Sequence, residues 1–320
     1  MTITGTVTSP PASHALGDLE APKAARRRRQ RLVPVAWLGP SLVLIVGVVV
    51  YPAIELVFLS LQKFNAAADD QGFWGLNNFR DLFAEPDLLH VLANTVLWVG
   101  VIVSVTVFIS LGLAQFLDKE FFGRRLVRLA LLVPWASSLV MTSIVWNYIF
   151  NYYYGYLNRF LLDLHIISSP VAWTENPNTV LWALIAVGII VSIPFTTYVF
   201  LAGLQSIPGD VYEAAAIDGA GRWQAYRQVT LPLLRPAITI AAILNIIYVF
   251  NSFPIIWVMT GNEPGSQADT TITFMYKIAF HTNLDIGEAS ALGLLNVVFI
   301  FIIVGIYLRF ARFGRRVDDA

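Results

Sequence analysis

Long apolar runs dominate this chain of 320 residues. A helix needs about 20 apolar residues to cross the ~30 Å hydrocarbon core of a membrane, and six runs are that long. They cover approximately 33–61, 90–117, 126–150, 179–204, 235–260 and 288–311. Lipid offers no partner for backbone N–H and C=O groups, so such spans must be helical. The sequence therefore predicts an all-α integral membrane protein with six transmembrane helices.

Composition agrees with this class and excludes others. Hydrophobic residues make up 57% of the chain and charged residues 13%, against about 25% charged in soluble proteins. The formal net charge is zero, so no nucleic-acid partner is expected. The chain has no Cys, which excludes disulfides, thiolate nucleophiles and Cys-bound metals.

The positions of Lys and Arg predict the orientation, because cytoplasmic connections carry an excess of both. Four of the 21 Lys and Arg residues, Lys63, Arg80, Arg159 and Lys277, fall on one side of the predicted spans. The other seventeen fall on the opposite side, in the two terminal regions, in 118–128 and in 205–235. Both termini and the 205–235 connection are therefore expected in the cytoplasm.

The segments divide as follows. Residues 1–31 are rich in Pro, Ala, Ser and Thr and end in a basic run, which predicts a disordered cytoplasmic tail. A signal peptide is the alternative, but the apolar run that follows is too long and lacks a small-residue cleavage site. We therefore expect a first anchor helix at 32–61, a five-helix core at 90–311 and a cytoplasmic tail at 312–320.

The predicted spans lack the groups that carry proton or ion transport. The middles of the last five spans contain no Asp, Glu, Lys, Arg or His. The chain also has no carboxylate pair, His pair or G-x-S-x-G turn at membrane depth, and no phosphate-binding G-x-x-x-x-G-K-[ST] loop. An ion-coupled carrier and a membrane enzyme are thus disfavoured, and uphill transport would need energy from another subunit.

Neutral hydrogen-bonding residues do occur in the spans. Asn245, Tyr248 and Ser252 follow i, i+3, i+7 spacing, which places them on one stripe of a helix. Amides and hydroxyls beside aromatic rings suit an uncharged, polyhydroxylated solute. The alternative is that these side chains hydrogen-bond between helices and hold the bundle together.

A polar island at 212–236 interrupts the apolar runs. Residues 208–210 are a turn signal with Asp210 as the expected N-cap. A short helix is expected over Val211–Ile217, a turn at Gly219, and a second short helix over Arg222–Val229. Such an elbow on the cytoplasmic side would bind a soluble partner.

The island carries a recognisable motif. Glu213-Ala214-Ala215, Gly219, Val229 and Leu231-Pro232 stand at the spacing of the EAA motif, with Val229 in place of the usual Ile. In this respect the chain resembles the permeases of ABC importers, specifically the carbohydrate-uptake branch that includes the maltose and glycerol-3-phosphate permeases. The likeness covers most of 35–312, including Tyr51-Pro52 and Leu76-Asn77-Asn78-Phe79. It implies the type I importer permease fold with both ends in the cytoplasm.

The resemblance also implies partners. These are a second homologous permease, two cytoplasmic ATPase subunits, and an extracellular or periplasmic solute-binding protein, in the plasma membrane of a bacterium or archaeon. No cofactor is expected in this chain, and ATP and Mg would be bound by the ATPase subunits. In the family the elbow at 210–236 is the coupling helix, and the residues implied to contact the ATPase or to shape the elbow are Glu213, Ala214, Ala215, Asp218, Gly219, Leu231 and Pro232.

A sugar site is implied in the same way. The candidates for substrate binding are Trp135, Ser138, Ser192, Phe195, Asn245 and Tyr248, with Asn251 and Ser252 added from their place in the fifth span. Gly188, Leu139 and Val249 occupy other positions of the maltose site, so the pocket is remodelled and maltose itself is not expected. The favoured function is import of a neutral sugar or oligosaccharide. The alternatives are a same-fold permease for glycerol phosphate or a glycerophosphodiester, and, in a different class, an ion-coupled secondary carrier.

Overall fold

The computed structural model describes residues 38–65, 67–281 and 284–313, which form two compact units divided between Glu55 and Leu56. In the first unit the described residues are helical and include the π-helical stretch η1 (Val46–Val50). The helix continues as α2 (Tyr51–Ser60), so that helical residues run from Leu38 to Ser60. This agrees with the predicted first span. The predicted tail at 1–31 and residues 314–320 lie outside the described residues.

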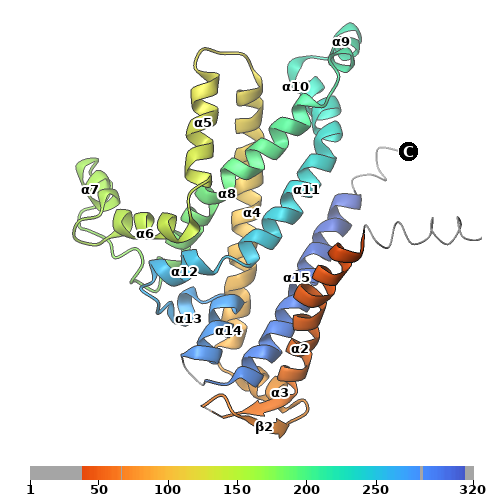
Figure 1. Cartoon of the computed structure of the whole chain (residues 1–320). Coiled ribbons are helices and arrows are strands. Elements are labelled where there is room, and N and C mark those ends of the chain that lie inside the picture. The colour runs from red at the N-terminus through yellow and green to blue at the C-terminus, as the bar shows by residue number, and fades with distance from the viewer. Residues whose placement is uncertain (1–37, 66, 282–283, 314–320) are drawn as a thin grey trace, which may run out of the picture. The chain divides into compact units, whose positions relative to one another are not determined.

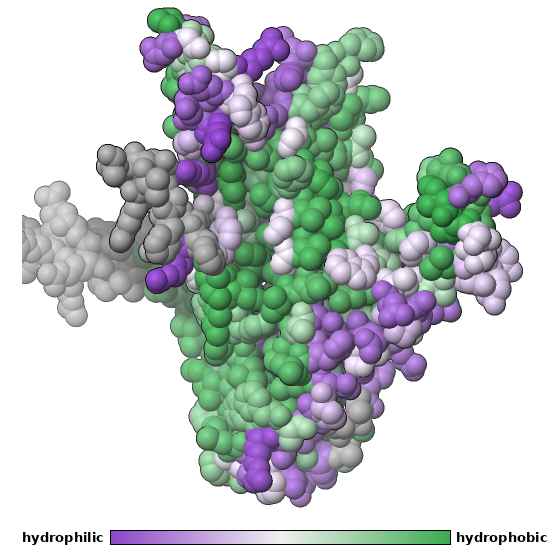
Figure 2. Space-filling model, turned by 180° about the vertical axis from the view of Figure 1, so that it is seen from behind, coloured by the Kyte–Doolittle hydropathy of each residue, from purple (hydrophilic) through white to green (hydrophobic). Residues whose placement is uncertain are grey.

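Among the described residues of the second unit, four continuous helical segments are long and apolar enough to span a membrane. They are α4 (Leu88–Asp118), α8 (Val180–Gln205), the segment Arg222–Phe250, and α15 (Ile286–Phe313) (Figure 1). Three of them confirm the spans predicted at 90–117, 179–204 and 288–311. Figure 2 shows hydrophobic residues over the long helices and hydrophilic residues gathered over the end that carries α9 and α10.

The predicted third span, 126–150, is not one straight helix. It consists of α5 (Arg124–Trp135) and α6 (Leu139–Phe150), which are bent by 97°. Pro134 lies inside α5 and has no N–H to continue the helix. Ser138 then takes an extended conformation, with φ −59° and ψ 134°. The predicted span is therefore broken, because the chain turns a corner at 136–138.

The predicted fifth span, 235–260, has different ends. The helical segment begins at Arg222 with α10 (Arg222–Ala225), continues through the π-helical η2 (Tyr226–Thr230), and ends with α11 (Leu231–Phe250). The chain leaves the helix at Asn251 and restarts as α12 (Phe253–Met259). Pro254 lies in the first turn of α12, where proline is well tolerated. The separate second short helix expected at Arg222–Val229 is therefore the start of the span.

Short elements fill the connections. A two-stranded antiparallel sheet, β1 (Gln62–Phe64) and β2 (Asp70–Phe73), was not predicted. Behind it, the Asn78 Nδ2 group donates to the backbone carbonyls of Ser60 at 2.8 Å and Gln62 at 2.7 Å. The remaining short helices are α3 (Asn77–Ala84), α7 (Tyr156–Asp163), α9 (Gly209–Ile217), α13 (Gly265–Ala268) and α14 (Thr271–Phe280).

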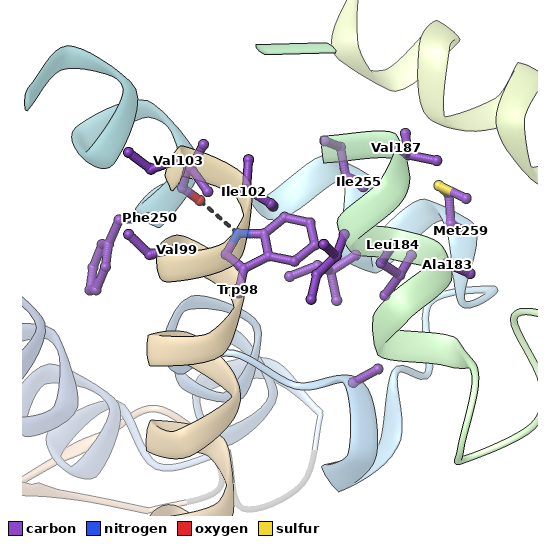
Figure 3. Close-up of a cluster of buried hydrophobic side chains, with 14 of the residues drawn as sticks. Trp98, Val99, Ile102, Val103, Ala183, Leu184, Val187, Phe250, Ile255 and Met259 are labelled. Carbon is purple, nitrogen blue, oxygen red and sulfur yellow. Dashed lines mark hydrogen bonds between the residues drawn. The ribbon is translucent and has the colours of Figure 1, made fainter. Parts of the chain in front are cut away.

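The largest buried cluster centres on Trp98 of α4 (Figure 3). Its indole lies among side chains of α8 and α12, including Leu184 and Ile255, and its Nε1–H donates to the Val249 carbonyl of α11 at 2.9 Å. The hydrogen bond satisfies a polar group that would otherwise be costly to bury. This cluster therefore joins α4, α8, α11 and α12 into one packed body.

Candidate functional site

A cavity of about 220 Å³ opens between α5, α8 and α11. Its lining includes five residues that the sequence predicts for a solute site: Trp135, Ser192, Phe195, Asn245 and Tyr248. Val191 and Leu244 complete the lining. None of these side chains is charged. The structure therefore brings together residues that are up to 113 positions apart in the chain.

Two aromatic rings form one wall of the cavity. Trp135 and Phe195 lie with their ring centroids 6.2 Å apart and their planes 18° from parallel. Trp135 holds this position because α5 ends at it, just before the corner at 136–138. At that corner the Ser137 Oγ group donates to the Val133 carbonyl at 3.3 Å, which supplies a carbonyl near the helix end with a donor. The corner thus presents a ring to the cavity.

The polar groups of the cavity are an amide and two hydroxyls. Asn245 and Ser192 are buried, while Tyr248 is exposed. The Asn245 Nδ2 group has no hydrogen-bond partner among the described residues. A buried amide donor without a partner costs about 1–3 kcal/mol. The cavity is therefore equipped to receive an acceptor oxygen from a bound solute.

Three of the predicted site residues do not line the cavity. Ser138 precedes α6. Asn251 is exposed, and its side-chain amide donates to the Ile247 carbonyl at 2.8 Å. Ser252 is buried, with a hydroxyl that has no partner among the described residues. The stripe that joined Ser252 to Asn245 assumed a continuous helix, and α11 ends before it reaches Ser252.

Sequence reasoning missed Val191 and Leu244. Each stands four residues before a predicted lining residue, Phe195 and Tyr248 respectively. Residues four apart share a helix face, so this spacing could have indicated both. Two other positions that correspond to the maltose site do not line the cavity. Gly188 and Val249 are buried and face the Trp98 cluster rather than the cavity.

The second feature is the elbow between α8 and the next span. Helix α9 begins at Gly209 with Pro208 as its N-cap, so the expectation that Asp210 caps it was wrong. Asp210 lies in the first turn instead, where a negative charge is favourable to the helix dipole. Tyr212 and Thr230 share a hydrogen bond between their hydroxyls at 3.2 Å. This bond holds α9 against η2.

The end of α9 explains the spacing between the alanines and the glycine. The Ala220 N–H donates to the Ala215 carbonyl at 2.9 Å, and the Gly219 N–H donates to the Ala216 carbonyl at 3.1 Å. Together these bonds form a Schellman motif, which needs a left-handed residue just past the helix. Gly219 supplies it with φ +82°. Asp218 is the C-cap of the helix.

The tip of the elbow is exposed and partly apolar. Glu213, Ala214, Asp218 and Gly219 are exposed, whereas Ala215, Leu231 and Pro232 are half-buried. Ile217 and Trp223 expose 87% and 72% of their surface. The tip therefore presents two large apolar side chains among polar ones.

Comparison with known proteins decides the family. Residues 106–316 match the family described as binding-protein-dependent transport system inner membrane component. The chain belongs to this family. The permease is 39% identical over 281 residues to a probable ABC transporter permease of Brucella suis biovar 1, covering 88% of this chain and 97% of the relative.

Relatives with named cargo are also found. The permease is 32% identical to the trehalose/maltose transport system permease MalF of Thermococcus litoralis, over 86% of this chain and 92% of the relative. It is 33% identical to the sulfoquinovosyl glycerol transport system permease SmoG of Agrobacterium fabrum, over 88% of this chain and 91% of the relative. These relatives confirm the carbohydrate-uptake branch of the ABC importer permeases.

Solved structures support the fold. A bacterial ABC transporter involved in alginate import matches with a TM-score of 0.78 and 21% identity, covering 91% of this chain and 98% of the solved one. The type I importer permease fold predicted from the sequence is thereby confirmed. The bent α5–α6 pair and the α9 elbow are thus parts of a membrane component of ABC transport.

Proposed function

We propose that this permease forms, with a second homologous permease, the translocation path for a neutral sugar or oligosaccharide. The cavity lined by Trp135, Phe195 and Asn245 is the observation that carries the proposal. Apolar faces of sugar rings pack on aromatic rings, while their hydroxyl oxygens accept from an amide donor such as Asn245. A cavity of about 220 Å³ suits one sugar ring at a time.

The absence of charge from the lining argues for a neutral cargo over an anionic one. A buried phosphate or phosphodiester is normally bound by cationic or multiple N–H donors, and the lining residues offer none that is charged. The relative that carries sulfoquinovosyl glycerol favours an acidic sugar as the second candidate. In that case the unpartnered Asn245 amide would face the anion.

The energy for uptake would come from ATP hydrolysed in two partner ATPase subunits, which bind ATP and Mg. The elbow at α9 would seat in the ATPase, with Glu213 at the contact and Ile217 and Trp223 supplying apolar surface. ATP-driven closure of the ATPase pair would rock the two permeases between inward- and outward-facing states. An extracytoplasmic solute-binding protein would deliver the sugar at the plasma membrane of a bacterium or archaeon.

The test is purification of the full chain from membranes of its native host, followed by reconstitution of the complex in proteoliposomes with the solute-binding protein. ATP-dependent uptake of a labelled neutral disaccharide is expected, with no competition by glycerol 3-phosphate. A complex without an ATPase subunit, or uptake driven by an ion gradient in place of ATP, would contradict the importer. Preference for glycerol phosphate would contradict the neutral cargo alone.

A further inference from the structure

A second, larger cavity lies at the turn between α4 and α5. Its volume is about 610 Å³, and its lining is Glu120, Phe121, Phe122, Gly123, Arg124, Arg125 and Arg128. Figure 1 shows this turn at the same end of the long helices as the α9 elbow. It shares no residue with the cavity at Trp135, and the proposed transport function does not use it.

The lining concentrates positive charge. The lining contains three arginines and only one acidic residue, Glu120. Within the described part of the chain, no acidic side chain forms an ion pair with Arg124, Arg125 or Arg128. Arg128 is held in place, because its Nη2 group donates to the Leu117 carbonyl at 3.1 Å. The Nε group of the same side chain is buried without a partner.

The helix dipole makes this charge concentration unfavourable by itself. The N-terminus of a helix carries a partial positive charge, so acidic residues are stabilising there and basic ones are not. Helices α9 and α15 follow this rule with Asp210 and Glu288 in their first turns. Helix α5 has no acidic residue in its first turn and begins with Arg124 and Arg125. An anion bound at this end of α5 would offset the positive charge of both the helix dipole and the arginines.

An apolar surface adjoins the charged cavity. Phe122 is fully exposed at the rim, and Leu126, Leu129 and Val133 are exposed along α5. The last three stand at i, i+3 and i+7, so they form one stripe that runs from the cavity along the helix. Over seven residues a helix rises about 10 Å. An anion with a long apolar chain could therefore contact both the arginines and this stripe.

We propose that the cavity binds the headgroup of an anionic membrane phospholipid, with an acyl chain along Leu126, Leu129 and Val133. The phosphate would lie between Arg124, Arg125 and the free Nε group of Arg128. A lipid in this position would be anchored to the same half-helix that carries Trp135 at its other end. Basic pockets at the cytoplasmic ends of spans are suited to such headgroups.

The test is native mass spectrometry of the full chain in detergent, with phosphatidylglycerol and phosphatidylethanolamine of identical acyl chains as probes. Tighter binding of phosphatidylglycerol is expected. Each Arg near a lipid surface contributes about fivefold in affinity, so Arg124→Gln/Arg125→Gln should weaken phosphatidylglycerol binding by roughly 30-fold. Arg222→Gln/Arg227→Gln removes the same charge at the elbow and should leave the affinity unchanged. Thermal unfolding of each variant checks that it is folded.

Two further probes separate a lipid from a soluble anion. A dihexanoyl phosphatidylglycerol should bind more weakly than its long-chain counterpart, and Leu129→Ser should reduce only the binding of the long-chain lipid. Inorganic phosphate at millimolar concentration should not compete. Competition by phosphate, equal binding of the two headgroups, or an equal loss in the two arginine double variants would each overturn the proposal.

Discussion

The Nε1–H group of Trp98 on α4 and the backbone carbonyl of Val249 on α11 are joined by a 2.9 Å hydrogen bond, although the residues are 151 positions apart. Val249 directly follows Tyr248, which lines the cavity between α5, α8 and α11. The bond therefore fixes the last turn of α11 against α4. It couples the packing of the core to the shape of the candidate solute site.

Replacing Trp98 by Phe should lower the free energy of unfolding by about 1–3 kcal/mol, because the indole donor is lost and a gap remains. The measurement is thermal unfolding of the full chain in detergent. Trp182→Phe is the matched control, since the Trp182 side chain is 54% exposed on α8. Equal destabilisation by both substitutions would show that the buried hydrogen bond is unimportant.

Gly188→Ala should destabilise the core by overpacking. A Cβ at Gly188 would lie 2.5 Å from Cδ1 of Ile102, so the isoleucine would have to move. The expected cost is about 1–3 kcal/mol. Ile102→Val removes the obstructing Cδ1 atom and should restore part of the stability in the double variant. Gly100→Ala, where a Cβ meets nothing within 4 Å, should be neutral.

Asn245→Leu should impair transport while keeping the side-chain volume. Loss of one hydrogen bond to the sugar is worth about 1–3 kcal/mol, or roughly 5–150-fold in affinity. Uptake into proteoliposomes should fall, and Tyr248→Ala should act in the same direction. The affinity of the solute-binding protein for sugar should not change. Wild-type uptake in both variants would make these side chains packing groups.

Asn251→Ala tests whether Asn251 belongs to the solute site, as the sequence predicts, or lies outside it, as the structure has it. The sequence predicts Asn251 in the solute site, whereas in the structure its amide bonds the Ile247 carbonyl and it lies outside the cavity lining. We expect nearly unchanged sugar transport. A loss as large as that of Asn245→Leu would restore Asn251 to the site.

Substitutions at Gly219 should uncouple ATP hydrolysis from uptake. At φ +82° a side chain costs about 1–2 kcal/mol, so Gly219→Ala should loosen the Schellman turn and Gly219→Asp should do so as well. Gly219→Asn should be milder, because Asn tolerates the left-handed region. Gly221→Ala has an ordinary φ and open space and serves as the control. The measurement is the rate of uptake and the rate of ATP hydrolysis in the same proteoliposomes. Uncoupling means that uptake falls while hydrolysis continues, and unchanged uptake in Gly219→Asp would contradict it.

Glu213→Ala tests the surface of the same elbow without altering its backbone. ATPase activity should continue while uptake falls, because Glu213 is exposed and would contact the ATPase. The membrane fold should remain intact by thermal unfolding. Uptake that matches the unaltered permease would remove this contact from the coupling mechanism.

Asp269, which lies in a connection outside the membrane spans, should make the stability of the fold depend on pH. Burial raises the pKa of its carboxyl above the ordinary value, and the Lys277 ammonium at 2.7 Å opposes this only in part. A raised pKa means that the folded state binds more protons than the unfolded state between the two values. The free energy of unfolding should therefore fall as pH rises from about 3.8 to the folded pKa, and then level off. Asp269→Asn should abolish this slope in pH-dependent thermal unfolding.

Several parts of this fold could be predicted because they depend on local pattern. Apolar length located α4, α8 and α15, and the spacing of Glu213 and Gly219 located the elbow. The corner at 136–138 could not be found in this way, since Pro134 alone permits either a kink or a straight helix. The end of α11 at Phe250 was missed for a similar reason. The five cavity residues were nevertheless predicted, all of them through the resemblance to the maltose permease site, and Asn245 and Tyr248 also through their helical spacing.

The π-helical turn η2 bears on which way the elbow points. In this turn the Leu231 N–H donates to the Tyr226 carbonyl, five residues back, so one residue more than an α-helix needs is present. Deleting Gln228 would restore an α-helix and swing α9 by about 100° around the axis of the span. The direction in which Glu213 points around the axis of the span is thus set by one extra residue in this turn. Gln228 lies between Gly219 and Val229, so the spacing of the EAA motif already counts this extra residue, and a permease that kept the motif residues but lacked it would present them in a different direction.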